Sequence, residues 1–424
     1  MAAYPFLCAM KLSSCALVSL LALAACHTQT SQPAATDAAA TADAPATSPA
    51  TVTNSPGTAY QVYRTLLPGQ ADSITLHLVS APRSFSDAQT AGRYGSYYGP
   101  DGHPYSLMGQ PSAAPDSVIL FDTSPEKAVG PTGDDLFWRL RRQPGRGDLA
   151  GTVGGQPVRL RAVVPAAGAL TFAVRYFADS AAAFPGEAKS PVGRISVQAL
   201  VPLGGEEKEL TTLEASMLRD LRGDTLDGLP ATTLTALYKQ QRQQFFQEYR
   251  QDATDSRPAP ADTAGVGPYG IGMNYEDQTA TYVLYQQGNL LSLGFYHYNF
   301  SGGAHGNYAL TPASYDLRTG RRLRYEDIFR PTAAQQLPAL LGQAVRPQLN
   351  LRPGESLDKQ LFVSKMPVTH QVFLTATGAV FIYQPYEIAS YAQGEITVFV
   401  PLAALRPLLR EGLPLPVASG VAAR

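Results

Sequence analysis

The sequence predicts an α+β fold with a mainly antiparallel sheet packed against helices, preceded by a small all-β module. Short alternating runs fill the chain beyond residue 58, helical periodicity follows, and strand-like runs then return without strict strand-helix-strand alternation. The 424 residues include 37 Gly, 34 Pro and 22 Tyr, a composition that suits many strands and turns. We therefore expect two folded domains, a small antiparallel β module over residues 58–165 and an α+β domain over residues 166–415.

The first residues have the order of a bacterial lipoprotein signal. A positive n-region containing Lys11 precedes an apolar run from Cys15 to Ala25, and Cys26 follows directly. These eleven residues are too few to span a bilayer, which takes about 20. Residues 1–25 are thus predicted to be a cleaved signal peptide, with Cys26 as the lipidation site. We expect a lipid-anchored, extracytoplasmic protein of the cell envelope, in the periplasm or at the cell surface.

The segment that follows, residues 26–57, is predicted to be a disordered tether, since it is rich in Ala, Thr and Pro and poor in large apolar side chains. All three cysteines, Cys8, Cys15 and Cys26, lie in the signal region, so the folded part is expected to contain no disulfide. The 33 basic and 34 acidic residues give a net charge of −1, which argues against a nucleic-acid partner. Contact with the membrane is expected through the lipid anchor only.

The β module is predicted from its alternation and turns. Ser73–Val79 and Pro157–Val163 alternate with period two and are expected to be half-buried strands. A Pro-Asp-Gly sequence at 100–102 separates two tyrosine-containing runs and predicts a hairpin. The apolar run Val118–Phe121 predicts another strand, and Trp138 is expected in the core.

The second domain begins with strands in residues 170–200 and continues with helices at Thr212–Leu221 and Leu234–Tyr249. The apolar face of the second helix is expected to comprise Leu234, Leu237, Tyr238, Phe245 and Tyr249. A loop rich in Pro, Ala and Gly is expected at 258–267, and a further helix within 326–348. The remaining predicted elements are strands at Thr281–Tyr285, Leu290–Tyr298, Gln371–Leu374, Val380–Tyr383 and Ile396–Val400, and a short helix at Ala403–Leu409.

Two motifs in connecting segments are unusual. Ser301–Asn307 reads Ser-Gly-Gly-Ala-His-Gly-Asn, and its glycines allow positive φ and close backbone approach. Tyr383–Gly394 contains three tyrosines, which supply large contact area at low entropic cost. We therefore take these two loops as a candidate binding surface. The candidate binding residues are Gly302, Gly303, His305, Asn307, Tyr386, Glu387 and Tyr391.

Together with Leu323–Phe329, the two motifs resemble an envelope domain of unknown function. This domain forms the lysozyme-binding ectodomain of the anti-sigma-V factor and also stands before the catalytic domain of peptidoglycan deacetylase C. The resemblance covers roughly residues 195–412 and is strongest from Tyr282 onward. It implies an extracytoplasmic recognition domain, with lysozyme binding in one branch. Sigma regulation and deacetylation are not implied, because no cytosolic sigma-binding segment and no His-x-x-x-His pair occur in the sequence.

The ionisable residues near the motifs do not form a convincing catalytic set. A metal site needs at least three ligands, and His297 and His305 have no third His or Cys nearby, so no metal or other cofactor is expected. His305 is expected to form a hydrogen bond within its own loop. Glu387 is favoured as a structural carboxylate that accepts backbone N–H groups. A glycosidase needs a second carboxylate at a defined separation, and nothing in the sequence places Asp316 or Glu395 beside it.

The sequence thus predicts a non-enzymatic, lipid-anchored envelope protein without catalytic residues. Its expected ligand is an envelope protein, such as a lysozyme-like one, or a peptidoglycan-type molecule. Two alternatives stay open. A cell-wall glycan-modifying enzyme would require Glu387 and His305 to converge in one cleft. A purely structural envelope module would use both motifs only to stabilise tight turns.

Overall fold

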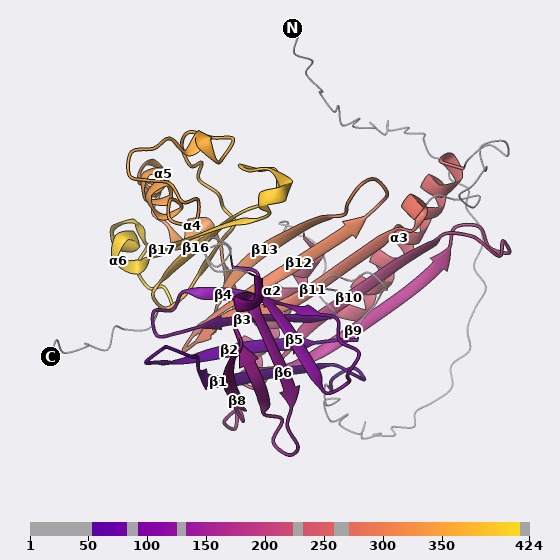
Figure 1. The fold of residues 1–424 in the computed structure, drawn as a ribbon, viewed down its shortest axis with the longest axis horizontal. Helices are drawn as coiled ribbons and strands as arrows, with labels where there is room; N and C mark the ends of the chain where they lie inside the picture. Colours follow the sequence, from indigo (N-terminus) through magenta and orange to yellow (C-terminus); the bar gives the residue numbers. More distant parts are fainter. Residues whose placement is uncertain (1–52, 83–91, 125–132, 224–231, 258–270, 416–424) are drawn as a thin grey trace, which may run out of the picture. The chain divides into compact units, whose positions relative to one another are not determined.

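The computed structural model describes residues 53–82, 92–124, 133–223, 232–257 and 271–415. The predicted signal peptide, Cys26, most of the tether and the loop expected at 258–267 lie outside these residues. The described chain is a mixed α+β structure, in which an eight-stranded β-barrel is followed by a mixed sheet with helices (Figure 1). The predicted class, α+β preceded by an all-β module, is therefore confirmed. No helix in the described residues is long and apolar enough to cross a membrane.

The all-β module is a closed antiparallel barrel whose strands follow one another in sequence order, with the first strand pairing with the last. The sequence predicted an antiparallel β module and several of its strands but not this closure, which removes the two exposed edges that an open sheet would have. The predicted hairpin at 100–102 is confirmed, with Gly102 at a φ of 65°. The strands are β1 (Ala59–Leu66), β2 (Ser73–Ser80), β3 (Arg93–Tyr98), β4 (Pro104–Gln110), β5 (Ser117–Asp122), β6 (Phe137–Arg142), β7 (Leu149–Val153) and β8 (Gln156–Ala162).

The barrel interior is filled by aliphatic and aromatic side chains around Trp138, which is fully buried as predicted. Along β8 the expected alternation holds, since Val158 and Leu160 are buried and their neighbours are exposed. In β2, however, the outward-facing His77 and Val79 are buried as well. The prediction of a half-buried strand at Ser73–Val79 is therefore wrong. This strand carries the same alternation, but its outer face lies against another sheet.

That second sheet has six strands in the order β14-β13-β12-β11-β10-β9. Strands β10 and β11 are parallel, and the other neighbouring pairs are antiparallel. A parallel pair needs a long crossover connection, and the chain between β10 and β11 contains two helices. The strands are β9 (Thr171–Ala182), β10 (Val192–Leu203), β11 (Glu276–Gln287), β12 (Leu290–Phe300), β13 (Asn307–Asp316) and β14 (Arg321–Leu323).

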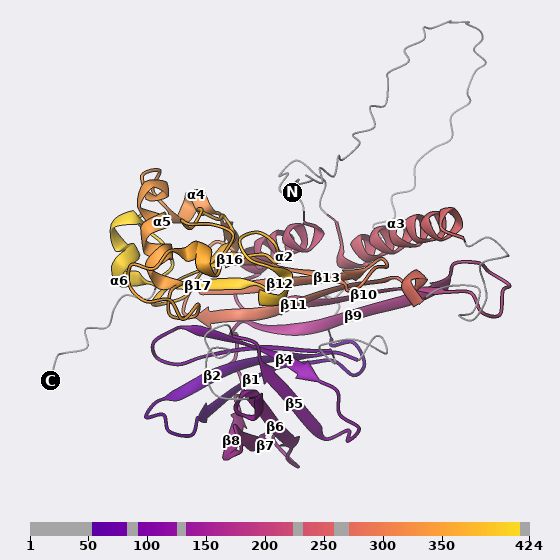
Figure 2. The ribbon, with the colours of Figure 1, turned by 45° about the horizontal axis from the view of Figure 1, so that its top comes forward.

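The crossover helices are α2 (Glu207–Arg222) and α3 (Leu234–Asp255), and both were predicted. The hydroxyl of Thr233 caps the start of α3 by accepting the Ala236 N–H group. The helix is longer than its periodicity indicated, and it buries Phe246 where Phe245 was expected. Figure 2 shows α2 and α3 on one face of the six-stranded sheet and the barrel on the other.

A third sheet, with three antiparallel strands in the order β15-β16-β17, lies beside the C-terminal helices. Its core includes Leu337, Leu341 and Phe381. The helix expected within residues 326–348 is present and starts at Ala333, directly after Pro331 and Thr332. The elements are β15 (Val372–Leu374), β16 (Gly378–Tyr383), β17 (Ile396–Pro401), α4 (Tyr325–Ile328), α5 (Ala333–Ala344) and α6 (Leu402–Leu405).

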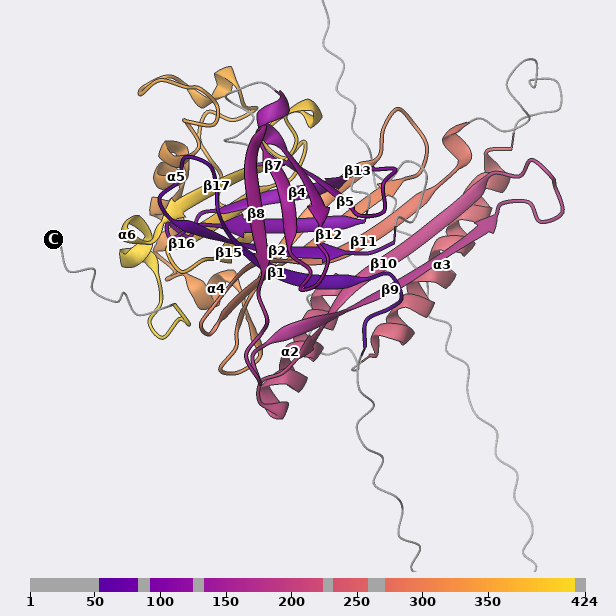
Figure 3. The same ribbon diagram turned by 60° about the horizontal axis from the view of Figure 1, so that its bottom comes forward.

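Buried hydroxyl groups connect the barrel and the two sheets. The Ser96 hydroxyl of β3 lies 2.6 Å from the carbonyl oxygen of Val283 and 2.9 Å from that of Leu284, both in β11. Ser292 of β12 donates to the carbonyl oxygen of Leu374 in β15 over 2.7 Å. Strands β2 and β3 of the barrel both contact β11, and Figure 3 shows β2 next to β11. Residues from more than one of these layers line the two cavities described below.

Candidate functional site

The glycine-rich motif is the hairpin connection between β12 and β13. Gly302 and Gly303 have φ values of 91° and 93°, a conformation that side-chain-bearing residues rarely adopt. Gly306 is required for a different reason, because a Cβ atom there would lie 2.5 Å from the ring of Tyr298. The loop therefore folds back tightly on its own strand and leaves His305 exposed at its tip.

The tyrosine-rich motif connects β16 to β17. Gln384 fixes its start, because its side-chain amide accepts the Leu310 N–H group over 3.1 Å and donates to the Leu310 carbonyl oxygen over 2.9 Å. With these two bonds the Gln384 side chain pairs with the backbone of β13 as the backbone of a neighbouring strand would. Tyr386, two residues later, has a φ of 70° and is 57% exposed. A bulky residue at positive φ is a genuine outlier, so the loop holds this ring outward under backbone strain.

The two motifs lie together. The His305 ring stacks on the Tyr391 ring with centroids 3.9 Å apart and planes inclined by 18°. The Tyr391 hydroxyl donates to the Gly306 carbonyl oxygen over 2.6 Å, and the Tyr386 ring lies 5.5 Å from the Tyr391 ring. We call this cluster the paired-loop surface, defined by residues 301–307 and 384–394. The sequence proposed both loops as one surface, and the structure places them in contact.

Glu387 and His305 have separate partners within this surface. The alternative hypothesis of a glycan-modifying enzyme requires these two residues to act in one cleft. The Glu387 carboxylate accepts the Gln384 N–H group over 2.9 Å, which is the structural role favoured from the sequence. His305 Nδ1 lies 2.9 Å from the carbonyl oxygen of Gly306 in its own loop, also as expected. No hydrogen bond or ion pair links Glu387 to His305 among the described residues.

The other ionisable residues considered from the sequence lie elsewhere in pairs. His297 forms an ion pair of 3.0 Å with Asp277 on the adjacent strand β11, and this carboxylate raises the pKa of the imidazole. Asp316 is held by the guanidinium of Arg318 at 2.6 Å. Within the described ranges, no three His, Cys, Asp or Glu side chains gather closely enough to hold a metal ion.

A cavity of about 350 Å³ lies directly beside the paired-loop surface, and we call it the tyrosine cavity. Gln393 and Gly394 of the tyrosine-rich loop form part of its wall. The barrel contributes hydroxyl groups, and the two sheets contribute aromatic and aliphatic side chains. The residues that line it are Pro104, Ser106, Met108, Thr123, Ser124, Tyr282, Leu284, Tyr296, Tyr308, Leu310, Phe373, Val380, Ile382, Gln393, Gly394, Glu395 and Thr397.

Glu395 is the one Asp, Glu, Lys, Arg or His residue among these lining residues. Protein atoms surround its carboxyl group, and burial raises its pKa to about 8. The side chain keeps some accessible surface, which we assign to the cavity that it lines. No side chain among the described residues forms a hydrogen bond or ion pair with this carboxyl group. The sequence considered Glu395 only as a distant second carboxylate and did not indicate its burial.

A series of tyrosine rings connects the cavity to the paired-loop surface. Tyr296 and Tyr308, on the neighbouring strands β12 and β13, have ring centroids 6.1 Å apart. Tyr308 in turn meets Tyr391 edge to face at 6.0 Å. On the inner side, Tyr94 of the barrel lies 5.7 Å from Tyr296. Aromatic contacts thus run without interruption from the barrel wall to the exposed loop.

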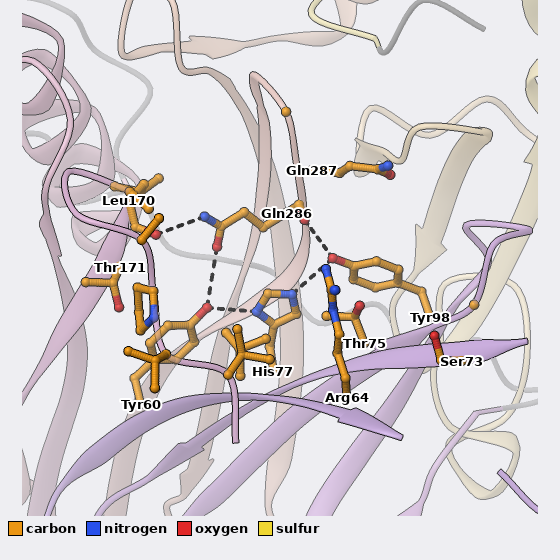
Figure 4. Close-up of a pocket in the computed structure, with 18 of the residues that line it drawn as sticks. Tyr60, Arg64, Ser73, Thr75, His77, Tyr98, Leu170, Thr171, Gln286 and Gln287 are labelled. Atoms are coloured by element: carbon orange, nitrogen blue, oxygen red, sulfur yellow. Dashed lines mark hydrogen bonds between the residues drawn. The ribbon is translucent and has the colours of Figure 1, made fainter. Parts of the chain in front are cut away.

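A second cavity, which the sequence did not indicate, lies at the junction of the barrel with β11. It measures about 620 Å³, and its wall carries a chain of hydrogen bonds (Figure 4). The Tyr60 hydroxyl lies 2.7 Å from His77 Nδ1, and His77 Nε2 lies 3.1 Å from the Tyr98 hydroxyl. Tyr98 donates to the carbonyl oxygen of Gln286 over 2.6 Å. This wall is therefore shared by the barrel and the six-stranded sheet.

The direction of these bonds fixes the state of His77. Since the Tyr98 proton points to Gln286, the Tyr98 oxygen accepts a proton from His77 Nε2, and Nδ1 then accepts from Tyr60. Complete burial lowers the pKa of His77 to about 3, so the imidazole is neutral at physiological pH. The hydrogen-bonding capacity of the imidazole is therefore used within the junction.

Comparison with known proteins agrees with the resemblance noted in the sequence. The model of the family described as deacetylase PdaC matches residues 211–308, and that of the protein of unknown function DUF3298 matches residues 326–403. A search of curated proteins found no match.

Among solved structures, a DUF3298 family member from Bacteroides fragilis is 23% identical, with 57% of this chain and 94% of that chain covered and a TM-score of 0.49. A DUF3298 family protein from Pseudomonas aeruginosa is 21% identical, with 58% and 98% covered and a TM-score of 0.40. The glycine-rich loop lies within the region that matches the PdaC model, and the tyrosine-rich loop lies within the region that matches the DUF3298 model. The chain thus carries a PdaC domain and a DUF3298 domain, and the paired-loop surface combines one loop from each.

Proposed function

We propose that this protein is a non-catalytic, lipid-anchored binding protein of the cell envelope that recognises an extracytoplasmic ligand through the paired-loop surface. The ligand is of peptidoglycan type or is a lysozyme-like protein that acts on peptidoglycan. The observation that carries the proposal is the aromatic group formed by the exposed His305 and Tyr386 rings on the half-buried Tyr391 ring. This proposal rests on the DUF3298 and PdaC domains for its class and on the loops for its site.

The strain at Tyr386 supports a binding role. A tyrosine at a φ of 70° destabilises the folded state. Because its ring is 57% exposed, burial of the ring does little to offset this cost. Such strain clusters at ligand-binding segments, where it keeps a side chain in the bound position. A tyrosine held outward in advance loses little conformational freedom when a ligand covers it.

The rigidity of the surrounding loops supports the same reading. Tyr391 is fixed by its bond to the Gly306 carbonyl oxygen, and the tyrosine-rich loop is fixed to β13 through Gln384. Flat aromatic rings offer apolar area to the face of a sugar ring or to the side chains of a protein. Because the Glu387 carboxylate is bound by a backbone N–H group, it supports the loop and leaves the rings to contact the ligand.

The predicted anchor supports the proposed location. An acylated Cys26 followed by a tether over residues 26–57 would let the folded part reach about 30 Å from the lipid surface. This span allows the paired-loop surface to meet a ligand in the cell wall while the protein stays attached. Expression of the Cys26→Ser variant is expected to release the protein from the membrane fraction.

The proposal is tested with the mature chain carrying Cys26→Ser. It is titrated against soluble peptidoglycan fragments and, separately, against lysozyme. We expect saturable binding in one of the two titrations, without change in the ligand's mass. Replacing Tyr386 by Ala is expected to weaken that binding at least tenfold, because exposed aromatic anchors dominate binding energy.

The matched control is Leu66→Ala, which removes another exposed apolar side chain, 54% accessible, from strand β1 of the barrel. This variant is expected to bind as the parent does. Equal affinity of the Tyr386→Ala variant and the parent would contradict the assigned surface. Release of sugar, acetate or peptide products that depends on Glu387 or His305 would instead favour the cell-wall enzyme.

A further inference from the structure

We propose that the tyrosine cavity is a binding site for a small organic ammonium ion, namely a primary amine on an apolar body, with Glu395 as the partner of the charged group. This inference concerns a different site from the paired-loop surface and does not depend on the proposed function. The two sites are adjacent, since Gln393 and Gly394 belong to both. Four features of the cavity lead to this ligand class.

The first feature is the missing partner of Glu395. The buried carboxylates of Asp122, Asp220 and Asp316 each have one. Asp122 accepts the Tyr97 hydroxyl over 2.6 Å, Asp220 is bound by Arg322 and Tyr315, and Asp316 is bound by Arg318. Glu395 has no such donor among the described residues, although burial of an unpaired carboxylate is costly. A cation in the cavity would supply the donor that the protein does not.

The second feature is the sign of the charge. No Lys, Arg or His side chain is among the residues that line the cavity, and Glu395 is the only carboxyl group there. The other titratable groups in its wall are Tyr282, Tyr296 and Tyr308 on β11, β12 and β13. Burial raises the pKa of each of these phenols, so they stay neutral at physiological pH. The barrel strands contribute hydroxyl groups without charge. The cavity thus favours a cation and disfavours an anion.

The third feature is the aromatic wall. Tyr282, Tyr296 and Tyr308 surround the space in front of Glu395, and the charge of this carboxylate acts on the Tyr282 and Tyr308 hydroxyl groups. The negative faces of aromatic rings attract ammonium ions, most strongly where water is excluded. A carboxylate beside several tyrosines can therefore bind an ammonium group both as an ion pair and through cation–π contacts.

The fourth feature is the apolar remainder of the wall. Leu284, Leu310, Phe373, Val380 and Ile382 line it, and the volume of about 350 Å³ is at the lower end of the range for small-molecule sites. These side chains cannot satisfy a polar ligand such as a free sugar. They suit the hydrocarbon or aromatic body of an amine, whose burial would supply the larger part of the binding free energy.

Gly394, at the boundary with the paired-loop surface, keeps this geometry. Its φ of 71° and ψ of −153° fall in a region that is essentially restricted to glycine. A Cβ atom there would lie 2.9 Å from the Tyr308 hydroxyl oxygen. The glycine therefore sets the position of the next residue, Glu395, against the tyrosine wall.

The test uses the mature chain with Cys26→Ser and two matched probe pairs. The amines are hexylamine and 2-phenylethylamine, and their neutral counterparts are hexanol and 2-phenylethanol. Calorimetric titration at pH 8 is expected to show saturable binding of at least one amine, at least tenfold tighter than its alcohol. Binding at pH 7 should release a proton, because the carboxyl group ionises when the ammonium ion enters. The affinity is expected to fall about tenfold per pH unit well below pH 8.

The Glu395→Gln variant is expected to lose at least tenfold in amine affinity and to bind the alcohols as the parent does. The matched control is Glu387→Gln, which changes a carboxylate of the same loop that does not line the cavity. This control and Tyr386→Ala should keep the amine affinity. The last variant separates failure at the cavity from failure at the paired-loop surface.

The inference is overturned if neither amine binds at millimolar concentration, if the alcohols bind as tightly as the amines, or if Glu395→Gln leaves amine binding unchanged. Thermal unfolding of the variant without ligand shows whether it is folded. Since glutamine has nearly the same shape and needs no ionisation in this buried position, the variant is expected to fold.

Discussion

Tyr386 combines a φ of 70° with a ring that is 57% exposed, so its backbone strain is not repaid by burial. The left-handed region costs a side-chain-bearing residue roughly 1–2 kcal/mol, whereas glycine adopts it freely. The ring, by contrast, contributes to the contact with Tyr391 and to the paired-loop surface. Stability and the proposed recognition therefore make opposite demands on this residue.

We expect Tyr386→Gly to exceed Tyr386→Ala in the free energy of unfolding by about 1 kcal/mol, because both remove the ring but only glycine removes the strain. Chemical denaturation of the two variants measures this difference. In an unstrained loop the Tyr386→Ala variant would be the more stable of the two. A higher stability of Tyr386→Ala than of Tyr386→Gly would therefore contradict backbone strain at this position. Both variants are expected to lose affinity for the ligand of the paired-loop surface.

At the scale of elements, the contact between barrel and sheet depends on an irregularity in β11. The pairing register of β11 with β12 shifts between Val283 and Tyr285. At this shift the Ser96 hydroxyl of β3 lies within hydrogen-bonding distance of the carbonyl oxygens of Val283 and Leu284. Irregular pairing of this kind often marks functional positions, and here it joins two layers of the fold.

Replacing Ser96 by Ala is expected to lower the free energy of unfolding by about 1–3 kcal/mol, because it removes a buried hydroxyl group that donates across the contact between the two layers. The control is Ser112→Ala, at an exposed position, which should change stability by less than about 0.5 kcal/mol. Equilibrium denaturation of the two variants gives both values. Equal effects would show that the Ser96 hydroxyl does not stabilise the contact.

At the scale of the whole molecule, the barrel and the six-stranded sheet share one hydrophobic core. Val79 and Tyr94 of the barrel pack in the same cluster as Val283, Leu293 and Tyr315 of the sheet. The two cavities beside this shared core are lined by His77 in one case and by Glu395 in the other, and burial shifts their pKa values to about 3 and to about 8. These groups couple the stability of the whole fold to pH with opposite signs.

The sign follows from which state binds more protons. For Glu395 the folded pKa of about 8 exceeds the ordinary value of 4.5, so the folded state holds the proton more tightly. Its contribution is most favourable below pH 4.5 and is lost as pH rises to 8. For His77 the folded pKa of about 3 lies below the ordinary 6.5, so its contribution is favourable above pH 6.5 and is lost as pH falls to 3.

We therefore expect Glu395→Gln to gain stability relative to the parent as pH rises from 4.5 to 8, by an amount of order 4 kcal/mol. His77→Gln should instead gain relative stability as pH falls from 6.5 toward 3. Denaturation curves at a series of pH values measure both differences. A difference between either variant and the parent that stays constant over its range would contradict the assigned pKa shift.

The sequence by itself determined the features that depend on neighbouring residues. Alternation over Pro157–Val163 and the turn at 100–102 gave a strand and a hairpin, because side-chain direction and turn geometry are local properties. The glycine- and tyrosine-rich loops indicated the domain type, because they are motifs of consecutive residues. The backbone role of Glu387 could also be predicted, since its donor Gln384 is three residues away.

The tertiary structure decided what lies against each of these elements. The alternation of Ser73–Val79 is the same in a half-buried and a fully buried strand, and only the packing of β11 against it buries His77. Ser96 and Val283 are 187 positions apart, and no periodicity connects them. Glu395 lies between a glycine and the start of a strand, and this common pattern does not indicate that the carboxyl group is buried. Its burial depends on tyrosines from three other strands, because desolvation is set by the groups that surround a residue in space.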